Sequence, residues 1–432
     1  MRVERTDWDG HEAAALARSL RATRPDLEDV VGAVAEIVRD VERRGDSALR
    51  ELTKRLDGVE PQGSLRVPAE EIERAGAEAS ADVREAMDKA VANIRAVAEA
   101  ELAAVSPVDV ELDDGQRVRV VEAPVGAAGV YAPGGRAAYP SSVLMCCVPA
   151  LAAGVERVAV ASPPAHDGRP ATAVLAACAM AGVDEVYAIG GAQSIAALAI
   201  GTEGVPPVDL IAGPGNPYVV EAKRMLSARV GIDGIAGPTE LVVVAGEDAD
   251  PRRVSLDLCA QAEHGTDGLL VAISTAPEIA ERIATLLGEL ASGRPSVPDA
   301  AVAAVTAPGV VEALELADSL APEHLELQLD DAEGRARGRV AGCVFVGPGG
   351  SAAFGDYAAG SNRVLPTGGA ARFGRPLGPR TFLRRMSIVS IPTGAAAALA
   401  PAVGALARAE GFPVHGESAE ARAGDNGRGV SE

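Results

Sequence analysis

The chain is 432 residues long, with 48% hydrophobic residues and a formal net charge of −21 at pH 7. At roughly 150 residues per domain, this length predicts two or three domains with enough apolar residues to build their cores. The acidic excess argues against nucleic-acid binding and against docking on an anionic membrane, because both need a basic surface. With 48 Gly, 29 Pro and only 3% aromatic residues, the composition favours an α/β enzyme over a β-sandwich or a disordered chain.

Cysteine usage and the lack of a long apolar span indicate a cytoplasmic protein. The five cysteines lie mostly in apolar stretches without a CxxC pair, which predicts buried free thiols in a reducing compartment. The first residues contain no apolar core of a secretory signal. The uncharged stretches 137–155 and 386–407 each contain two prolines, and neither resembles a Leu/Ile-rich membrane span.

Residues 11–105 are predicted to be helical. The segments 28–55 and 70–104 carry apolar residues three to four apart, with Glu and Arg on the other face. We interpret them as a supporting helical layer without chemistry, packing with the second of two α/β domains. Asp113-Asp114-Gly115 then predicts a hairpin turn between strands at 108–112 and 117–122.

From residue 129 short strands alternate with helices, the pattern of a doubly wound parallel sheet. The first run has strands at 129–132, 157–161, 185–189 and 208–212, and helices at 141–153, 171–181, 192–200 and 218–228. The second has strands at 240–245, 268–275, 324–329 and 341–346, and helices at 251–264, 277–291 and 310–320.

We therefore predict an α/β protein with two doubly wound, Rossmann-like parallel-sheet domains, a helical N-terminal region and a C-terminal extension. The boundaries we expect are 1–114 for the helical part, 115–238 and 239–378 for the two α/β domains, 379–418 for the extension and 419–432 for a disordered tail.

Three predicted strand ends in the first run carry glycines: Tyr131-Ala132-Pro133-Gly134-Gly135, Gly190-Gly191-Ala192-Gln193 and Gly213-Pro214-Gly215-Asn216. In open α/β sheets ligands bind beyond the carboxyl ends of strands, where helices begin and glycine lets a phosphate approach the backbone. None of these loops has the G-x-G-x-x-G spacing. A nucleotide site and plain tight turns therefore both remain possible, and we favour the nucleotide site.

The helix predicted at 251–264 begins at Asp250-Pro251 and stops before Gly265. Gln261 and His264 are three residues apart, so they share a face at its end. They could ligate a metal, or His264 could cap the helix, where the dipole favours a cation.

Glu323 and His324 follow Pro322, which ends the preceding helix, and stand just before an alternating strand. A carboxylate beside an imidazole is suited to proton transfer near neutral pH, although a solvated loop pair is the alternative. Asp356 could supply a further carboxylate ligand. His415 lies in the C-terminal extension, and its residue type alone assigns it no role.

Together these segments resemble the histidinol dehydrogenase family from about residue 25 to 416. The most specific segments are GIDGIAGPTE at 231–240 and DLCAQAEH at 257–264. Supporting segments are YAPGG at 131–135, GGAQ at 190–193, GPGN at 213–216, PEHL at 322–325, GDY at 355–357 and VLPT at 364–367.

The resemblance implies a role for each candidate residue. It implies one Zn²⁺ per subunit held by Gln261, His264, Asp356 and His415, a catalytic pair of Glu323 and His324, and NAD contacts from Tyr131, Gln193 and Asn216. It also implies substrate contacts from Thr239 and Glu410, together with Gln261, His264, His324, Asp356 and His415. The extension at 379–418 would cross to the partner of a homodimer, so that Glu410 and His415 complete the neighbouring active site.

The implied reaction is the zinc-dependent, NAD-linked oxidation of L-histidinol to L-histidine through bound histidinaldehyde, the last step of histidine biosynthesis. One departure is Arg363, where the family usually has His. A permanent cation there could hold the carboxylate of the product, or it could favour another polar or anionic alcohol. A third interpretation is a non-catalytic relative that only binds nucleotide or metal. The intact catalytic pair and the intact ligand set argue against it.

Overall fold

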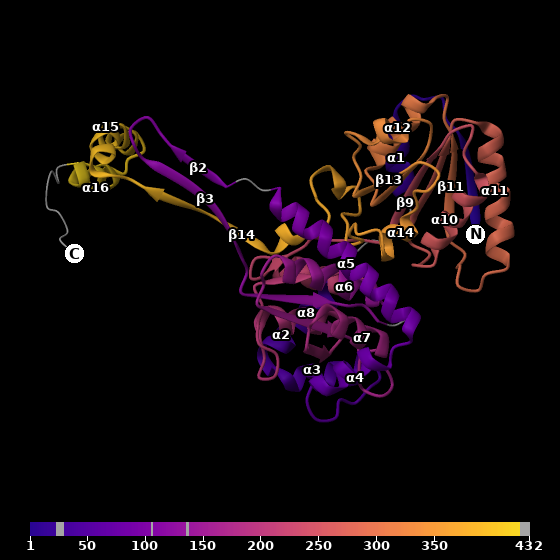
Figure 1. The fold of residues 1–432 in the computed structure, drawn as a ribbon, viewed down its shortest axis with the longest axis horizontal. Helices are drawn as coiled ribbons and strands as arrows, with labels where there is room; N and C mark the ends of the chain where they lie inside the picture. The colour runs from indigo at the N-terminus through magenta and orange to yellow at the C-terminus, as the bar shows by residue number, and fades with distance from the viewer. Residues whose placement is uncertain (23–29, 105–106, 135–137, 424–432) are drawn as a thin grey trace. The chain divides into compact units, whose positions relative to one another are not determined.

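The structure, a computed structural model, describes residues 1–22, 30–104, 107–134 and 138–423. The chain forms two compact units, a larger one of residues 1–100 and 125–382 and a smaller one of residues 101–124 and 383–432. Among the described residues, no helix combines the length and the apolar character needed to cross a bilayer. Both parallel sheets belong to the larger unit (Figure 1).

The first sheet has five parallel strands in the order β6-β5-β4-β7-β8. Its central strands are buried on both faces, as expected when helices cover both sides of a parallel sheet. Residues of α6 and α7 share one core with the sheet, and residues of α8 and α9 share another. The bounds are β4 Ala127–Tyr131, α6 Pro140–Ala152, β5 Arg157–Ser162, α7 Thr172–Ala181, β6 Glu185–Ala188, α8 Gly191–Ile200, β7 Leu210–Ala212, α9 Pro217–Leu226 and β8 Gly231–Ile232.

The second sheet has six parallel strands in the order β1-β11-β10-β9-β12-β13. Helices α10 and α11 share one core with it, while α1, α12 and α13 share the other. The bounds are β9 Glu240–Ala245, α10 Pro251–Ala262, β10 Leu269–Ser274, α11 Pro277–Ser292, β11 Ala301–Thr306, α12 Val310–Leu320, β12 His324–Gln328, α13 Ala332–Ala336, β13 Cys343–Val346, α14 Ala352–Tyr357, η2 Ala370–Arg372 and η3 Pro379–Phe382. The predicted α/β architecture with two parallel sheets is confirmed.

The N-terminal region divides between the two sheets. β1 (Arg2–Asp7) and α1 (Ala13–Arg21) join the second sheet, as expected. The helices after them pack on the first sheet instead, so the expectation that the whole region packs with the second α/β domain is corrected. Their apolar stripes predict burial but do not identify the surface that buries them. The bounds are α2 Val31–Arg44, α3 Asp46–Leu56, α4 Ala69–Glu78 and α5 Ala81–Ala103.

The smaller unit contains an antiparallel sheet in the order β14-β3-β2, with α15 packed on α16. The predicted hairpin is confirmed, with Gly115 at φ 89° in its turn. α16 runs to Ala423, so residues 419–423 are helical rather than disordered, and the rest of the predicted tail lies outside the described residues. The predicted domain boundaries stay predictions. The bounds are β2 Val108–Glu111, β3 Arg117–Pro124, β14 Leu383–Ser390, α15 Thr393–Ala409 and α16 Pro413–Ala423.

Candidate active site

The glycine-bearing loops at the carboxyl ends of β4, β6 and β7 border a cavity of about 750 Å³, which we call the coenzyme cavity. Tyr131, Gln193 and Asn216, the three residues expected to contact NAD, all line it. The side-chain nitrogen and oxygen of Gln193 are both buried without a hydrogen-bond partner among the described residues. Such orphaned groups are rare in folded proteins, and a ligand in the cavity would satisfy them.

Tyr131 and Asn216 are fixed by the loops themselves. The Tyr131 hydroxyl accepts a hydrogen bond from Gly191 N at 3.1 Å, and burial raises the pKa of Tyr131 to about 12. The Asn216 side chain caps α9 by accepting from Val219 N at 3.1 Å. This cap uses the amide oxygen of Asn216 and leaves its nitrogen to donate.

The loop before Asn216 needs glycine at its first position. Gly213 has φ 116°, and a Cβ there would lie 2.2 Å from the carbonyl oxygen of Tyr131. Buried Lys223 donates to Gly213 O at 3.1 Å and pairs with Asp233, which in turn accepts from Gly213 N at 2.7 Å. The ion pair therefore holds both polar backbone groups of Gly213.

The predicted catalytic pair stands at the amino edge of the second sheet, where β9 and β12 begin. Glu323 and His324 are buried, with 7% and 2% of their surfaces exposed, so the alternative of a solvated loop pair is wrong. Oε2 of Glu323 accepts from the Thr239 hydroxyl at 2.6 Å and from Glu240 N at 2.8 Å. Both donors engage the same oxygen, which leaves Oε1 for other partners.

The His324 ring is oriented by a backbone carbonyl. Its Nδ1 lies 3.1 Å from Glu240 O, and because a carbonyl only accepts, Nδ1 carries the proton and Nε2 is the basic nitrogen of the neutral ring. Nε2 faces Asp356, 3.7 Å from Oδ1. Burial alone would lower the pKa of His324, but the carboxylates of Glu323 and Asp356 outweigh it and raise that pKa to about 9.

Three of the four predicted metal ligands come together here. His264 Nε2 lies 3.6 Å from Asp356 Oδ2. Burial acts to raise the pKa of Asp356, but the hydrogen bond from His264 and the positive charges of Arg363 and His324 lower it overall. Gln261 stands in the last turn of α10 and donates through Nε2 to the Thr239 hydroxyl.

The Thr239 hydroxyl determines which way the Gln261 amide points. Its single proton goes to Glu323, so toward Gln261 it can only accept. The Gln261 nitrogen therefore faces Thr239, and the amide oxygen is left as a possible metal ligand. Across the described part of the chain, no three His, Cys, Asp or Glu side chains are gathered into a metal site, so an ion here would need both this oxygen and a ligand from elsewhere.

The remaining predicted site residues, Glu410 and His415, belong to the smaller unit. Glu410 is the C-cap of α15, and His415 lies in α16 with its ring centroid 5.6 Å from that of Phe412. Both side chains are exposed.

A second cavity, of about 380 Å³, is lined by Thr239, His264, Glu323 and Arg363, and we call it the substrate cavity. Arg363 donates to Ser141 Oγ at 2.8 Å, lies 4.0 Å from Asp356 Oδ1 and stands 5.7 Å from the centre of the Tyr139 ring. Pro133, Gly134 and Asn216 line both cavities, so the two adjoin.

One support for the catalytic pair was not predicted from the sequence. Arg21 on α1 forms a two-pronged ion pair with Glu240, at 2.8 and 2.9 Å, and also donates twice to the carbonyl of Leu320 at the end of α12. The Glu240 carboxylate accepts from Glu323 N at 3.3 Å and from Gly368 N at 2.7 Å. The short loop between α12 and β12 carries Glu323, and we call it the catalytic loop. Arg21 and Glu240 thus connect α1 to Leu320 before this loop and to Glu323 within it.

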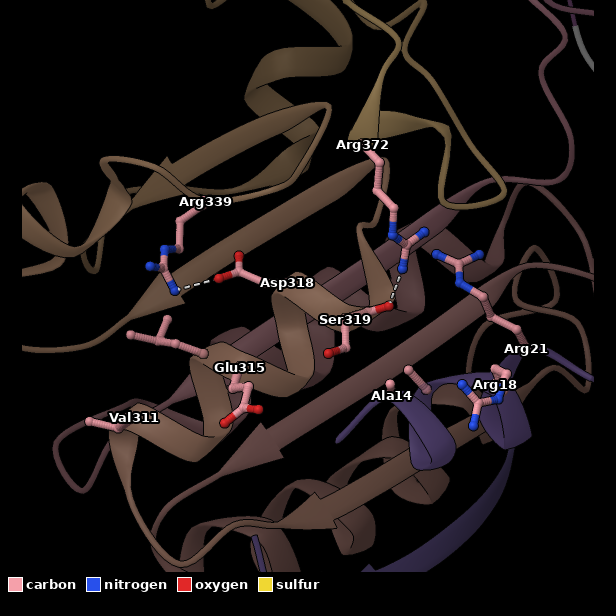
Figure 2. A pocket seen from close by; sticks show the side chains of 11 residues that line it. Ala14, Arg18, Arg21, Val311, Glu315, Asp318, Ser319, Arg339 and Arg372 are labelled. Carbon is pink, nitrogen blue, oxygen red and sulfur yellow. Dashed lines mark hydrogen bonds and ion pairs between the residues drawn. The ribbon is translucent and has the colours of Figure 1, made fainter. Parts of the chain in front are cut away.

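On its other side Arg21 borders a separate pocket between α1 and α12. Figure 2 shows the side chains of Arg18, Arg21, Arg339 and Arg372 around it, with Arg339 paired to Asp318. This pocket has a volume of about 770 Å³ and is distinct from the coenzyme and substrate cavities.

Comparison with known proteins agrees with this geometry. The histidinol dehydrogenase family model matches residues 20–423. The chain is 44% identical over 421 residues to a histidinol dehydrogenase of Ruegeria pomeroyi, covering 94% of this chain and 95% of the relative. It is 45% identical over 412 residues to that of Caulobacter vibrioides, covering 91% and 92%.

The crystal structure of histidinol dehydrogenase from Elizabethkingia anophelis superposes with a TM-score of 0.89 at 28% identity, covering 98% of each chain. With the family model and both relatives spanning nearly the whole chain, this protein is an oxidoreductase that belongs to the histidinol dehydrogenase family.

Proposed function

We propose that this enzyme oxidises L-histidinol to L-histidine in two NAD-linked steps through bound histidinaldehyde, at the end of histidine biosynthesis. The observation that carries the proposal is the buried pair Glu323 and His324, which contacts Thr239 and Asp356, with Glu323 lining a cavity that adjoins the coenzyme cavity. Family membership across the whole chain supports the substrate.

The residues present fit both groups that the family resemblance implies, NAD and zinc. The orphaned amide of Gln193, with Tyr131 and Asn216, suits a dinucleotide that accepts hydride. Asp356, His264 and the outward oxygen of Gln261 form a mixed O/N donor set that suits zinc, with His415 of the partner subunit as the fourth ligand. When bound, zinc would supply positive charge that orients the alcohol and amine of the substrate.

The protein's own groups divide the proton transfers. In its neutral form, which dominates above its pKa of about 9, His324 takes the hydroxyl proton of the alcohol on Nε2 while hydride leaves the same carbon, which yields the aldehyde. Glu323 then accepts a proton from the water that adds to the aldehyde, and His324 assists loss of the second hydride. Two NAD are reduced for each histidinol. Burial of both side chains keeps bulk water from the aldehyde between the steps.

Arg363 supports a second candidate substrate class. Its guanidinium lines the substrate cavity and is largely buried, with 11% of its side chain exposed. Such a cation could pair with the product carboxylate or with an anionic alcohol. NADH formation with purified histidinol tests the first proposal. No NADH from histidinol, together with turnover of an anionic alcohol, would establish the second.

We further propose a homodimer with shared sites, acting in the cytoplasm. The five cysteines are free and four of them are buried, which suits a reducing compartment.

The shared site can be tested with two variants. His264→Ala and His415→Ala should each be nearly inactive, since either change removes a zinc ligand. If the two are unfolded and refolded together, about half of the dimers are mixed and each carries one intact site. About a quarter of wild-type activity should therefore return. No recovery from a zinc-loaded mixture would refute the shared site.

A further inference from the structure

Asp57 is a half-buried carboxylate that lines the coenzyme cavity and has no role so far. It is the C-cap of α3, and its Oδ1 lies 3.2 Å from the position of a Cβ on Gly190, beside the start of α8. Its Oδ2 is buried without a hydrogen-bond partner among the described residues. Burial raises the pKa of Asp57 to about 6, so keeping it ionised near neutral pH costs free energy.

The lining of the two cavities places Asp57 at one end of the coenzyme cavity. Pro133, Gly134 and Asn216 border both cavities, so the reactive end of a bound dinucleotide must lie near these three residues. Asp57 and His166 line only the coenzyme cavity. They therefore stand where the other half of the coenzyme, the adenosine, would lie.

An adenosine half offers few groups that a carboxylate can bind. Its phosphates repel a carboxylate, whereas the ribose presents vicinal hydroxyl donors. Acidic side chains hold the ribose 2′-hydroxyl in many dinucleotide-binding folds, and the same charge excludes a 2′-phosphate. A carboxylate that lines the cavity, lies beside a helix start and has an oxygen without a hydrogen-bond partner among the described residues fits this task.

We propose that Asp57 binds the 2′-hydroxyl of the adenosine ribose and selects NAD over NADP. This inference rests on the proposed coenzyme site, and it adds a specificity residue that the sequence motifs did not identify. Asp57→Asn removes the charge while keeping the shape, and Asp57→Ala removes both. Both variants lose a half-buried carboxylate whose Oδ2 has no hydrogen-bond partner among the described residues, so both are expected to fold.

The test is calorimetric binding of NAD and NADP to the enzyme without substrate, which does not depend on turnover. Hydrogen bonds to charged groups contribute about 1.5–3 kcal/mol, so Asp57→Ala should weaken NAD binding roughly tenfold or more. In Asp57→Asn, NADP binding should become tighter relative to NAD, and the preference for NAD should fall by about tenfold or more. Glu60→Gln is the matched control, because it removes an exposed charge three residues away outside the cavity.

Two results would overturn the role of Asp57. Unchanged dissociation constants in both variants would mean that Asp57 does not touch the coenzyme. Equal weakening of NAD and NADP would mean that it contacts a part of the coenzyme other than the 2′ position. If wild-type enzyme bound neither dinucleotide, the proposed function itself would fail, so the two failures are distinguishable.

Discussion

Removing Arg21 tests whether the catalytic pair depends on a residue that touches neither substrate nor coenzyme. In Arg21→Ala, the fully buried Glu240, at 0% exposure, would lose its two-pronged ion pair with Arg21. Breaking a buried ion pair from one side costs up to about 3–5 kcal/mol of stability. The Leu320 carbonyl, just before the catalytic loop, would lose its two donors in the same step.

The effect on turnover follows from the contacts of Glu240. If its carboxylate turns away, Glu323 N and Gly368 N lose their acceptor and the catalytic loop can shift. A misplacement of about 1 Å can cost on the order of 100-fold in rate. We therefore expect kcat for both oxidations to fall about 100-fold, with a much smaller change in KM, because the groups that line the two cavities stay in place.

Chemical rescue separates positioning from a general loss of stability. The deleted side chain would leave a space open to the pocket of Figure 2, which Arg21 borders. Guanidinium ion below denaturing concentration should enter it and restore part of kcat, whereas neutral urea should not. Arg18→Ala is the matched control, since Arg18 lines the same pocket one turn away on the same helix and does not pair with Glu240. A folded Arg21→Ala enzyme with wild-type kcat would refute the reasoning, as would equal responses to guanidinium and urea.

Three further substitutions test the remaining assignments. Glu323→Gln should keep the first oxidation and lose most of the second, because Gln cannot accept the proton of the attacking water. Assays started from histidinaldehyde check this, and an unimpaired variant would end the assignment. Arg363→His should change histidinol turnover by less than about tenfold, since roughly 1.4 kcal/mol is what one non-essential contact contributes. A gain of orders of magnitude would point to a different natural substrate. Burial raises the pKa of Asp57 from 3.8 to about 6, so the stability linked to its protonation is fully present below pH 3.8 and is lost as the pH rises through about 6. Asp57→Asn should therefore raise the melting temperature more above this window than below it, and equal shifts in thermal melts at both pH values would contradict the assigned pKa.

Much of the fold could be predicted because its signals are local. Turn glycines, helix caps and short Val/Ile/Ala runs mark most inner strands and helices of both sheets, and the predicted boundaries mostly agree with the structure within a few residues, but the inner strand β11 was not predicted. The outer strand β1 was missed because its sequence, RVERTD, is largely exposed and charged and reads as irregular chain. The strand β14, LRRMSIVS, was also missed and is likewise mostly exposed. Edge strands bury little, so they carry a weak pattern.

The chemistry-bearing residues of the site were also predictable, but their supports were not. Glu323 and His324 are adjacent in sequence, and Gln261 and His264 share one helix end, so each pair has a local signal. Arg21 and Glu240 are 219 residues apart, and no periodicity links them. Asp57 follows a helix whose charged residues are mostly exposed, so its sequence context predicts a surface position. Only the folded structure shows that Asp57 lines the coenzyme cavity.

The two sheets contribute opposite edges to the chemistry. The coenzyme loops follow the carboxyl ends of β4, β6 and β7, where helix starts favour phosphates. The predicted catalytic pair stands at the start of β12, at the amino edge of the second sheet, where Gln261 and His264 lie at and just after the end of α10. A helix end carries partial negative charge that favours a cation, so each edge suits the charge of the group expected there. In the proposed function, the hydride donor would stand on the metal side and the acceptor on the phosphate side, and the residues shared by the two cavities mark where they would meet.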